Sequence, residues 1–193
     1  MEVKNCLYTV LFHHQIEFSM KILGFISSFL LVVVFFGASA STAAAQEATP
    51  KKMVASPPAT ATGKIGDANV TINYAQPSVK GRKIWGELVP YGQVWRTGAN
   101  EATTFTTDKA LTFNGQTLPA GTYSLFTIPG EKEWTVIFNK TAKQWGAFNY
   151  KSADDAIRFT ATPAKSAAFN EQMKIAVADN KVHIMWENVE VKF

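Results

Sequence analysis

Residue types that bind polar ligands are concentrated in one segment of the sequence, Gly81 to Glu101. The segment holds two of the three arginines and two of the five tryptophans of the chain. Arginine presents a planar fork that suits carboxylates, phosphates or sugar hydroxyls, and tryptophan offers a flat apolar face on which sugar rings or cations stack. The segment therefore predicts a site for a small anionic or glycan-like ligand, made by Arg82, Lys83, Trp85, Trp95, Arg96, Asn100 and Glu101.

The same residues also fit a purely structural interpretation. Tryptophan is highly buried on average, so both indoles could fill the core. Arg96 could pair with Glu101 across the turn Gly98-Ala99-Asn100 and hold the loop in place. In a strand through Val94 to Thr97, alternation would place Val94 and Arg96 on one face and Trp95 and Thr97 on the other. Both interpretations remain open from the sequence.

The C-terminal two thirds of the chain contain few of the histidine and cysteine residues that commonly act in catalysis. His183 is the one histidine there, and its alternation with Val182 and Ile184 predicts a place on the solvent face of a strand. The single cysteine, Cys6, lies near the N-terminus. One histidine and no cysteine are too few ligands for a zinc site in this part of the chain, so no metal site is predicted. No cofactor is predicted either. Asp154 and Asp155 are predicted to lie in a solvated turn. The enzyme alternative is a hydrolase or lyase with Glu101 as base and Arg96 as electrostatic stabiliser.

The charge pattern gives no sign of a nucleic-acid partner. The formal net charge is +4, and the lysines are scattered without a basic run. Nucleic-acid binding usually shows a clustered basic stripe or a known module, so none is predicted.

Residues 1–45 carry the features of an N-terminal extension and a signal peptide. Met20-Lys21 precedes an apolar run, no charge occurs from Ile22 to Ala45, and small residues follow the run. This pattern predicts export to the periplasm or the extracellular space, with cleavage after Ala40 or Ala45 and membrane contact only through the targeting segment. The alternative is an uncleaved anchor, and translation from Met20 would explain the charged stretch before it.

The rest of the chain predicts a flexible linker over residues 46–62 and one domain over residues 63–193. The linker is rich in alanine, threonine, proline and lysine. Beyond it, short alternating runs such as Val70, Ile72 and Tyr74 are typical of strands. Turn signals at Asn114-Gly115, Pro119-Ala120-Gly121 and Asp179-Asn180 separate about nine such runs. The expected fold is all-β, an antiparallel β-sandwich or jelly-roll-like barrel, with a long loop between Pro77 and Gln93.

Four stretches of this domain resemble a known family. They are YAQPSVKGRKIWGELVPYGQVWRTGAN, LPAGTYSLFTIPG, EWTVIFNK and QWGAFNY, between Tyr74 and Tyr150. They are similar to secreted bacterial proteins catalogued as domain of unknown function 2911, and the resemblance spans about Asn69 to Phe193. It implies export but assigns no activity and no site residue. Three function classes therefore stay open: a binding module, the enzyme described above, and an interaction domain without a small-molecule site.

Overall fold

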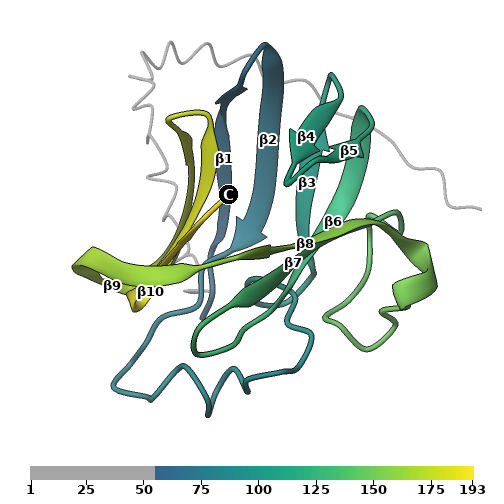
Figure 1. The fold of residues 1–193 in the computed structure, drawn as a ribbon. Coiled ribbons are helices and arrows are strands. Elements are labelled where there is room, and N and C mark those ends of the chain that lie inside the picture. The colour runs from purple at the N-terminus through teal and green to yellow at the C-terminus, as the bar shows by residue number, and fades with distance from the viewer. Residues whose placement is uncertain (1–54) are drawn as a thin grey trace, which may run out of the picture. The chain divides into compact units, whose positions relative to one another are not determined.

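Strands account for nearly all regular structure in residues 55–193, the part of the chain that the computed structural model describes (Figure 1). The predicted extension, the signal peptide and the first part of the predicted linker lie outside the described residues. The ten strands are β1 (Pro58–Ile65), β2 (Ala68–Ala75), β3 (Thr103–Thr107), β4 (Leu111–Phe113), β5 (Gln116–Leu118), β6 (Gly121–Ile128), β7 (Trp134–Asn139), β8 (Asp155–Ala161), β9 (Pro163–Ala178) and β10 (Lys181–Lys192). One short 3₁₀ helix, η1, covers Ser152–Asp154. The all-β prediction is confirmed, with one strand more than expected.

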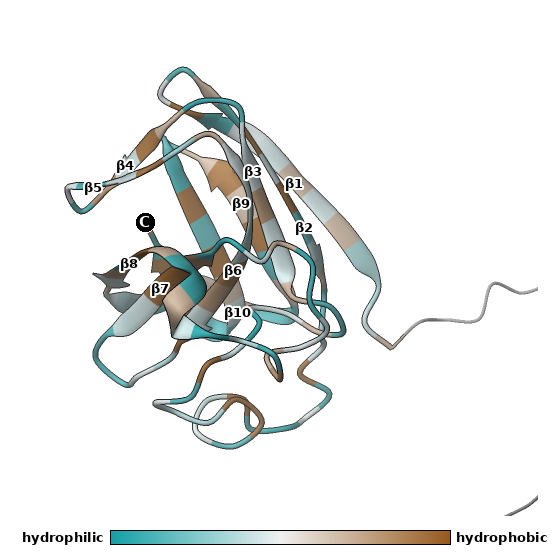
Figure 2. Ribbon diagram, turned by 90° about the vertical axis from the view of Figure 1, so that its right-hand side faces the viewer, coloured by the Kyte–Doolittle hydropathy of each residue, from teal (hydrophilic) through white to brown (hydrophobic). Residues whose placement is uncertain are grey.

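The largest sheet has six strands in the order β1-β2-β3-β6-β7-β8, and all its neighbouring strands are antiparallel. Alternation decides which side chains face inward. In β2, Val70, Ile72 and Tyr74 are buried, whereas Thr71 and Asn73 point to the outer face. The same alternation is visible as brown and teal bands along the strands in Figure 2. The sheet therefore has an apolar inner face, and its outer face is polar over β1, β2 and β3. Over β6 and β7 the outer face carries a second, smaller apolar cluster that includes Ala102, Phe126 and Ile137.

A long hairpin of β9 and β10 forms the second layer. Its residues Ile175, Ile184 and Trp186 are buried in the same core as Ile72 and Phe138 of the large sheet. The last strand is one element that bends near the positive-φ residue Glu187, rather than two separate strands. Its two ends pair with each other, because Val182 and Phe193 exchange backbone hydrogen bonds. This layering confirms the predicted sandwich.

Two of the predicted tight turns are confirmed by their backbone conformation. Asn114 and Gly115, between β4 and β5, have φ of 47° and 77°. Asp179 and Asn180, between β9 and β10, have φ of 51° and 58°. Two successive positive φ angles define the tight hairpin turn that Asn, Asp and Gly accommodate best. Residue type at these four positions thus sets both hairpins.

The predicted linker requires a correction, because its last five residues belong to β1. Pro58 to Thr62 pair in register with Ala75 to Thr71 of β2. β1 also approaches β9 closely: a Cβ on Gly63 would lie 2.7 Å from the Cβ of Val177. Only small residues fit there, so the strand alternates alanine or glycine with threonine or lysine. A prediction based on large apolar residues therefore misses it, and the domain begins before Pro58 rather than at Gly63.

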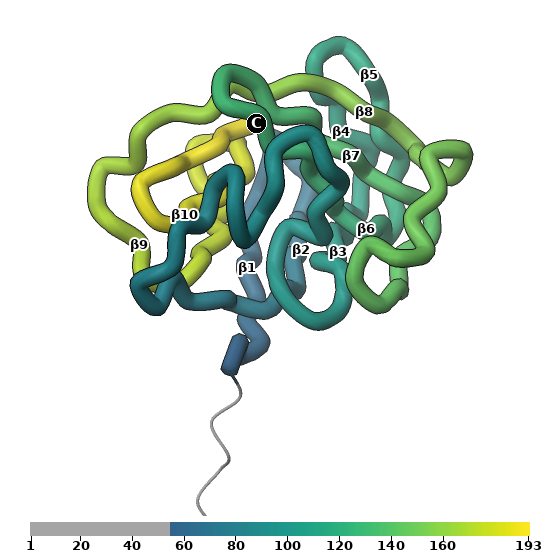
Figure 3. The backbone as a smooth tube through the Cα atoms, turned by 90° about the horizontal axis from the view of Figure 1, so that it is seen from below, coloured from purple at the N-terminus to yellow at the C-terminus, as the bar shows by residue number. Residues whose placement is uncertain are grey.

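The segment between β2 and β3, residues 76–102, is irregular, as expected for its first part. It lies across one end of the domain, which Figure 3 views from below. Val94 to Thr97 does not form a strand; Trp95 alone exchanges backbone hydrogen bonds with Thr127, at 2.7 and 2.9 Å. No helix among the described residues is long and apolar enough to cross a membrane.

Candidate functional site

Trp85 and Trp95, the two aromatic members of the predicted site, lie in the core. They expose 8% and 9% of their surface and pack with Trp134 and Trp186, with ring centroids 4.9 to 6.3 Å apart. Neither ring presents an open face to a ligand. The structure therefore gives these two indoles the role of joining the segment 76–102 to both layers of the sandwich.

Two basic members of the predicted site, Arg82 and Lys83, make their contacts within their own loop. The exposed Arg82 donates from Nη2 to the carbonyl of Ser78 at 2.6 Å and from Nε to that of Val79 at 3.1 Å. Lys83 forms an exposed ion pair with Glu87 at 3.1 Å. Such surface contacts add little stability, and here they only shape their own loop.

Arg96 is half-buried, and its Nε has no hydrogen-bond partner. Desolvation by burial lowers the pKa of this guanidinium. No ion pair joins Arg96 to Glu101 within the described part of the chain, so the expected clamp across the turn is not formed. Arg96 therefore does not fasten Glu101.

Asn100 and Glu101, the remaining two predicted residues, line a cavity of about 580 Å³ on the outer face of the large sheet. This size falls in the range of small-ligand pockets, roughly 300–1,000 Å³. Further polar side chains in the lining come from three strands and one loop: Thr60, Asn73, Thr104 and Lys143. Thr60 also donates from Oγ1 to Oδ1 of Asn73 at 2.8 Å. We refer to this space as the outer-face cavity.

One wall of the outer-face cavity is a short ribbon made of two loops. Glu101 and Trp145 form an antiparallel bridge. Beside it, the Ala102 N–H donates to the Gln144 carbonyl at 3.0 Å, and the Gly146 N–H donates to the Asn100 carbonyl at 3.1 Å. The pairing places Trp145 at the rim, where it is 61% exposed, and it is the one exposed indole of the five.

A buried polar network fixes the loop that carries Trp145. Gln144 donates from Nε2 to Oγ of Ser124 and to Oδ1 of Asn139, both at 3.2 Å. Asn139 in turn donates from Nδ2 to the carbonyl of Lys151 at 3.0 Å and to Oδ1 of Asp155 at 2.9 Å. Ser124 and Asn139 are fully buried. The loop from Thr141 to Lys151 is thereby bound down onto β6, β7 and β8.

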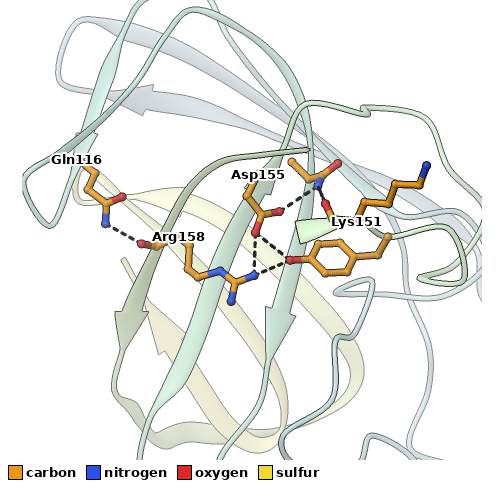
Figure 4. Close-up of polar contacts among 6 residues, drawn as sticks. Gln116, Lys151, Asp155 and Arg158 are labelled. Carbon is orange, nitrogen blue, oxygen red and sulfur yellow. Dashed lines mark hydrogen bonds and ion pairs between the residues drawn. The ribbon is translucent and has the colours of Figure 1, made fainter. Parts of the chain in front are cut away.

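The end of this loop is held by a cluster around Asp155 (Figure 4). Tyr150 donates from its hydroxyl to Oδ2 of Asp155 at 2.8 Å, and Arg158 donates to the same carboxylate at 2.7 Å. Burial, followed by the contact with Asp155, raises the pKa of Tyr150 to about 12. At the edge of the sheet, Gln116 donates from Nε2 to the backbone carbonyl of Arg158 at 2.6 Å. Asp155 is thus an anchor, and not the solvated turn residue expected from the sequence.

His183 also departs from its predicted position on a solvent face. Its side chain is 12% exposed, and its Nδ1 lies 2.9 Å from Oε1 of Glu190. The bend of β10 brings these two residues side by side, and the sequence pattern does not show that bend. Within residues 55–193 no three His, Cys, Asp or Glu side chains gather to hold a metal ion.

Sequence reasoning missed most of the residues that line the outer-face cavity. Thr60 lay in the predicted linker, and Asn73 and Thr104 are ordinary outward-facing strand residues. Trp145 could not be told apart from the four buried tryptophans by residue type. No signal in the sequence brings these residues together, because they converge only through strand pairing and loop anchoring.

Comparison with known proteins gives one match. A family model described as "Protein of unknown function (DUF2911)" matches residues 56–193. No curated protein matches the chain, and no solved structure does.

Proposed function

Because the chain belongs to the DUF2911 family, which assigns no chemistry, we propose from the geometry that this domain is a binding module. Its ligand is a hydroxylated, glycan-like molecule, and its site is the outer-face cavity. The observation that carries the proposal is the position of Trp145, an exposed indole at the rim of a cavity lined by hydroxyl, amide and charged side chains.

The chemistry of the lining favours sugar hydroxyls. Thr60, Thr104, Asn73 and Asn100 can each donate and accept hydrogen bonds, as a hydroxylated ligand requires. An exposed indole supplies a flat apolar surface for the C–H face of a sugar ring. A concave site with a few convergent polar groups beside an aromatic wall is the usual form of a small-ligand pocket.

An anionic ligand receives less support. Neither Arg82 nor Arg96 lines the cavity, and the positive charge of Lys143 is opposed by the carboxylate of Glu101. The enzyme alternative is also weaker. Glycoside hydrolysis generally needs two carboxyl groups across the bond. Among the described residues that line the cavity, Glu101 is the one carboxylate.

Trp145→Ala should weaken ligand binding about tenfold without unfolding the domain. An aromatic contact contributes about 0.5–1.5 kcal/mol beyond the area it buries, and the exposed indole supports little of the core. Binding is measured by titration calorimetry with cellohexaose, xylohexaose, chitohexaose and maltohexaose. The full chain contains the apolar run of the targeting segment and is therefore kept in detergent. The detergent has no sugar head group, because such a head group would compete with the oligosaccharides for the site.

Phe148→Ala is the matched control, since Phe148 is 83% exposed in the same loop and does not line the cavity. Equal losses in the two variants would contradict the assigned position of the ligand, and a failure of all four oligosaccharides to bind would contradict the binding proposal. Release of new reducing ends during incubation would favour the hydrolase alternative instead.

We also propose that the protein is exported and works in the periplasm or the extracellular space. The uncharged apolar run before Ala40 supports this. Mass spectrometry of the protein recovered from its host should show a chain that begins near Ser41 or Gln46. A chain that retains Phe29 to Phe36 would indicate an anchor instead.

A further inference from the structure

The floor of the outer-face cavity belongs to a row of polar side chains that crosses the whole large sheet. Strand register places Thr60 opposite Asn73, and Asn73 opposite Thr104. The same row continues through Ser124, Asn139 and Asp155 of the next three strands. The first half of the row lines the cavity, whereas the second half is covered by the loop from Thr141 to Lys151.

A second row lies two residues further along the strands, about 7 Å away. It consists of four outward-facing threonines in register across β1, β2, β3 and β6: Thr62, Thr71, Thr106 and Thr122. All four are exposed or half-buried, and the hydroxyls of Thr106 and Thr122 lie 3.0 Å apart. This threonine row carries no charge. The next row does, because Lys64 lies opposite Asn69, which is bonded to Asp108.

The covering loop decides in which direction a ligand can leave the cavity. Gln144 and Trp145 form the wall over the covered half of the first row. The threonine row continues the uncharged polar surface from the open half of the first row. A ligand whose end lies in the cavity can therefore extend along the strands across the threonine row, until the charged row is reached.

We propose that the ligand is an extended, neutral oligosaccharide chain, bound with one end in the outer-face cavity and its following units on the threonine row. The inference rests on the proposed function and specifies its substrate class. Outward-facing polar side chains repeat about every 7 Å along the strands, so a straight chain of β-1,4-linked sugars that follows the strands stays on this face and meets both rows. A curled α-1,4-linked chain would leave such a face after the first units.

The length dependence of binding tests this inference. The full chain is titrated with cello- and chito-oligosaccharides of two to six units, and with maltohexaose for comparison. Affinity should rise with length and then level off when the threonine row is filled. The double variant Thr62→Val/Thr71→Val keeps the branched side-chain shape but loses two hydroxyls. It should weaken hexasaccharide binding about tenfold, which corresponds to two modest hydrogen bonds, and leave disaccharide binding unchanged.

Thr117→Val, on the separate β4–β5 hairpin, is the matched control and should change neither affinity. Equal affinity for the disaccharide and the hexasaccharide would overturn the extended site while leaving the cavity proposal standing. A double variant that binds the hexasaccharide as tightly as the parent would overturn it too. If no oligosaccharide of any length binds, the proposed function fails together with this inference.

Discussion

Trp134→Ala should lower the free energy of unfolding by about 3–5 kcal/mol, the cost typical of truncating a buried tryptophan. Trp134 is 2% exposed in β7, and its ring centroid lies 4.9 Å from that of Trp85 and 6.3 Å from that of Trp95. The substitution therefore removes the part of the cluster that belongs to the large sheet. Urea unfolding followed by far-ultraviolet circular dichroism measures the effect, because tryptophan fluorescence itself is altered by the change.

Trp145→Ala removes the same side chain from an exposed position and is the control. Its stability loss should stay below about 1 kcal/mol, as is usual for surface substitutions. Similar losses at positions 134 and 145 would contradict the division between a buried tryptophan cluster and an exposed indole.

Asn139→Ala should cost about 2–4 kcal/mol of stability and also weaken binding at the outer-face cavity. Asn139 is fully buried and donates to the Lys151 carbonyl and to Asp155. It also accepts from the Thr141 N–H and from Gln144. Alanine leaves these groups without a partner, and each unsatisfied buried group costs about 1–3 kcal/mol. The expected total is smaller than their sum, because the loop can rearrange toward water.

Iodide quenching of tryptophan fluorescence reports whether Asn139→Ala loosens the loop that carries Trp145. Trp145 is the one indole of five that quencher reaches readily, so its quenching constant follows the loop that carries it. A loosened loop should raise that constant. Asn149→Ala, an exposed position in the same loop, is the control and should leave it unchanged. Unaltered quenching and binding in Asn139→Ala would show that the buried network does not position Trp145.

Local sequence determined the strands and hairpins of this domain to a large extent. Residue alternation in β2, and the positive-φ residues Asn114, Gly115, Asp179 and Asn180, suffice to predict them. It did not reveal β1, because small residues replace large apolar ones where β1 approaches β9. Nor did it reveal the bend in β10 that brings His183 to Glu190. At β1 the approach of a distant segment, β9, decides which residues fit, and the local pattern does not predict that approach.

The candidate site was decided almost entirely by tertiary structure. The sequence marked Gly81 to Glu101 by its arginines and tryptophans, and of the seven predicted site residues only Asn100 and Glu101 line the outer-face cavity. The sequence by itself predicts that Asn73 and Thr104 point outward, because the period of a strand is two, but it does not place Thr60 in a strand. Their assembly depends on long-range pairing of β1, β2 and β3 and on the anchoring of the Trp145 loop by Asn139. Burial works in the same way: the five tryptophans are chemically identical in the sequence, and only their packing partners separate the four core residues from the one exposed indole.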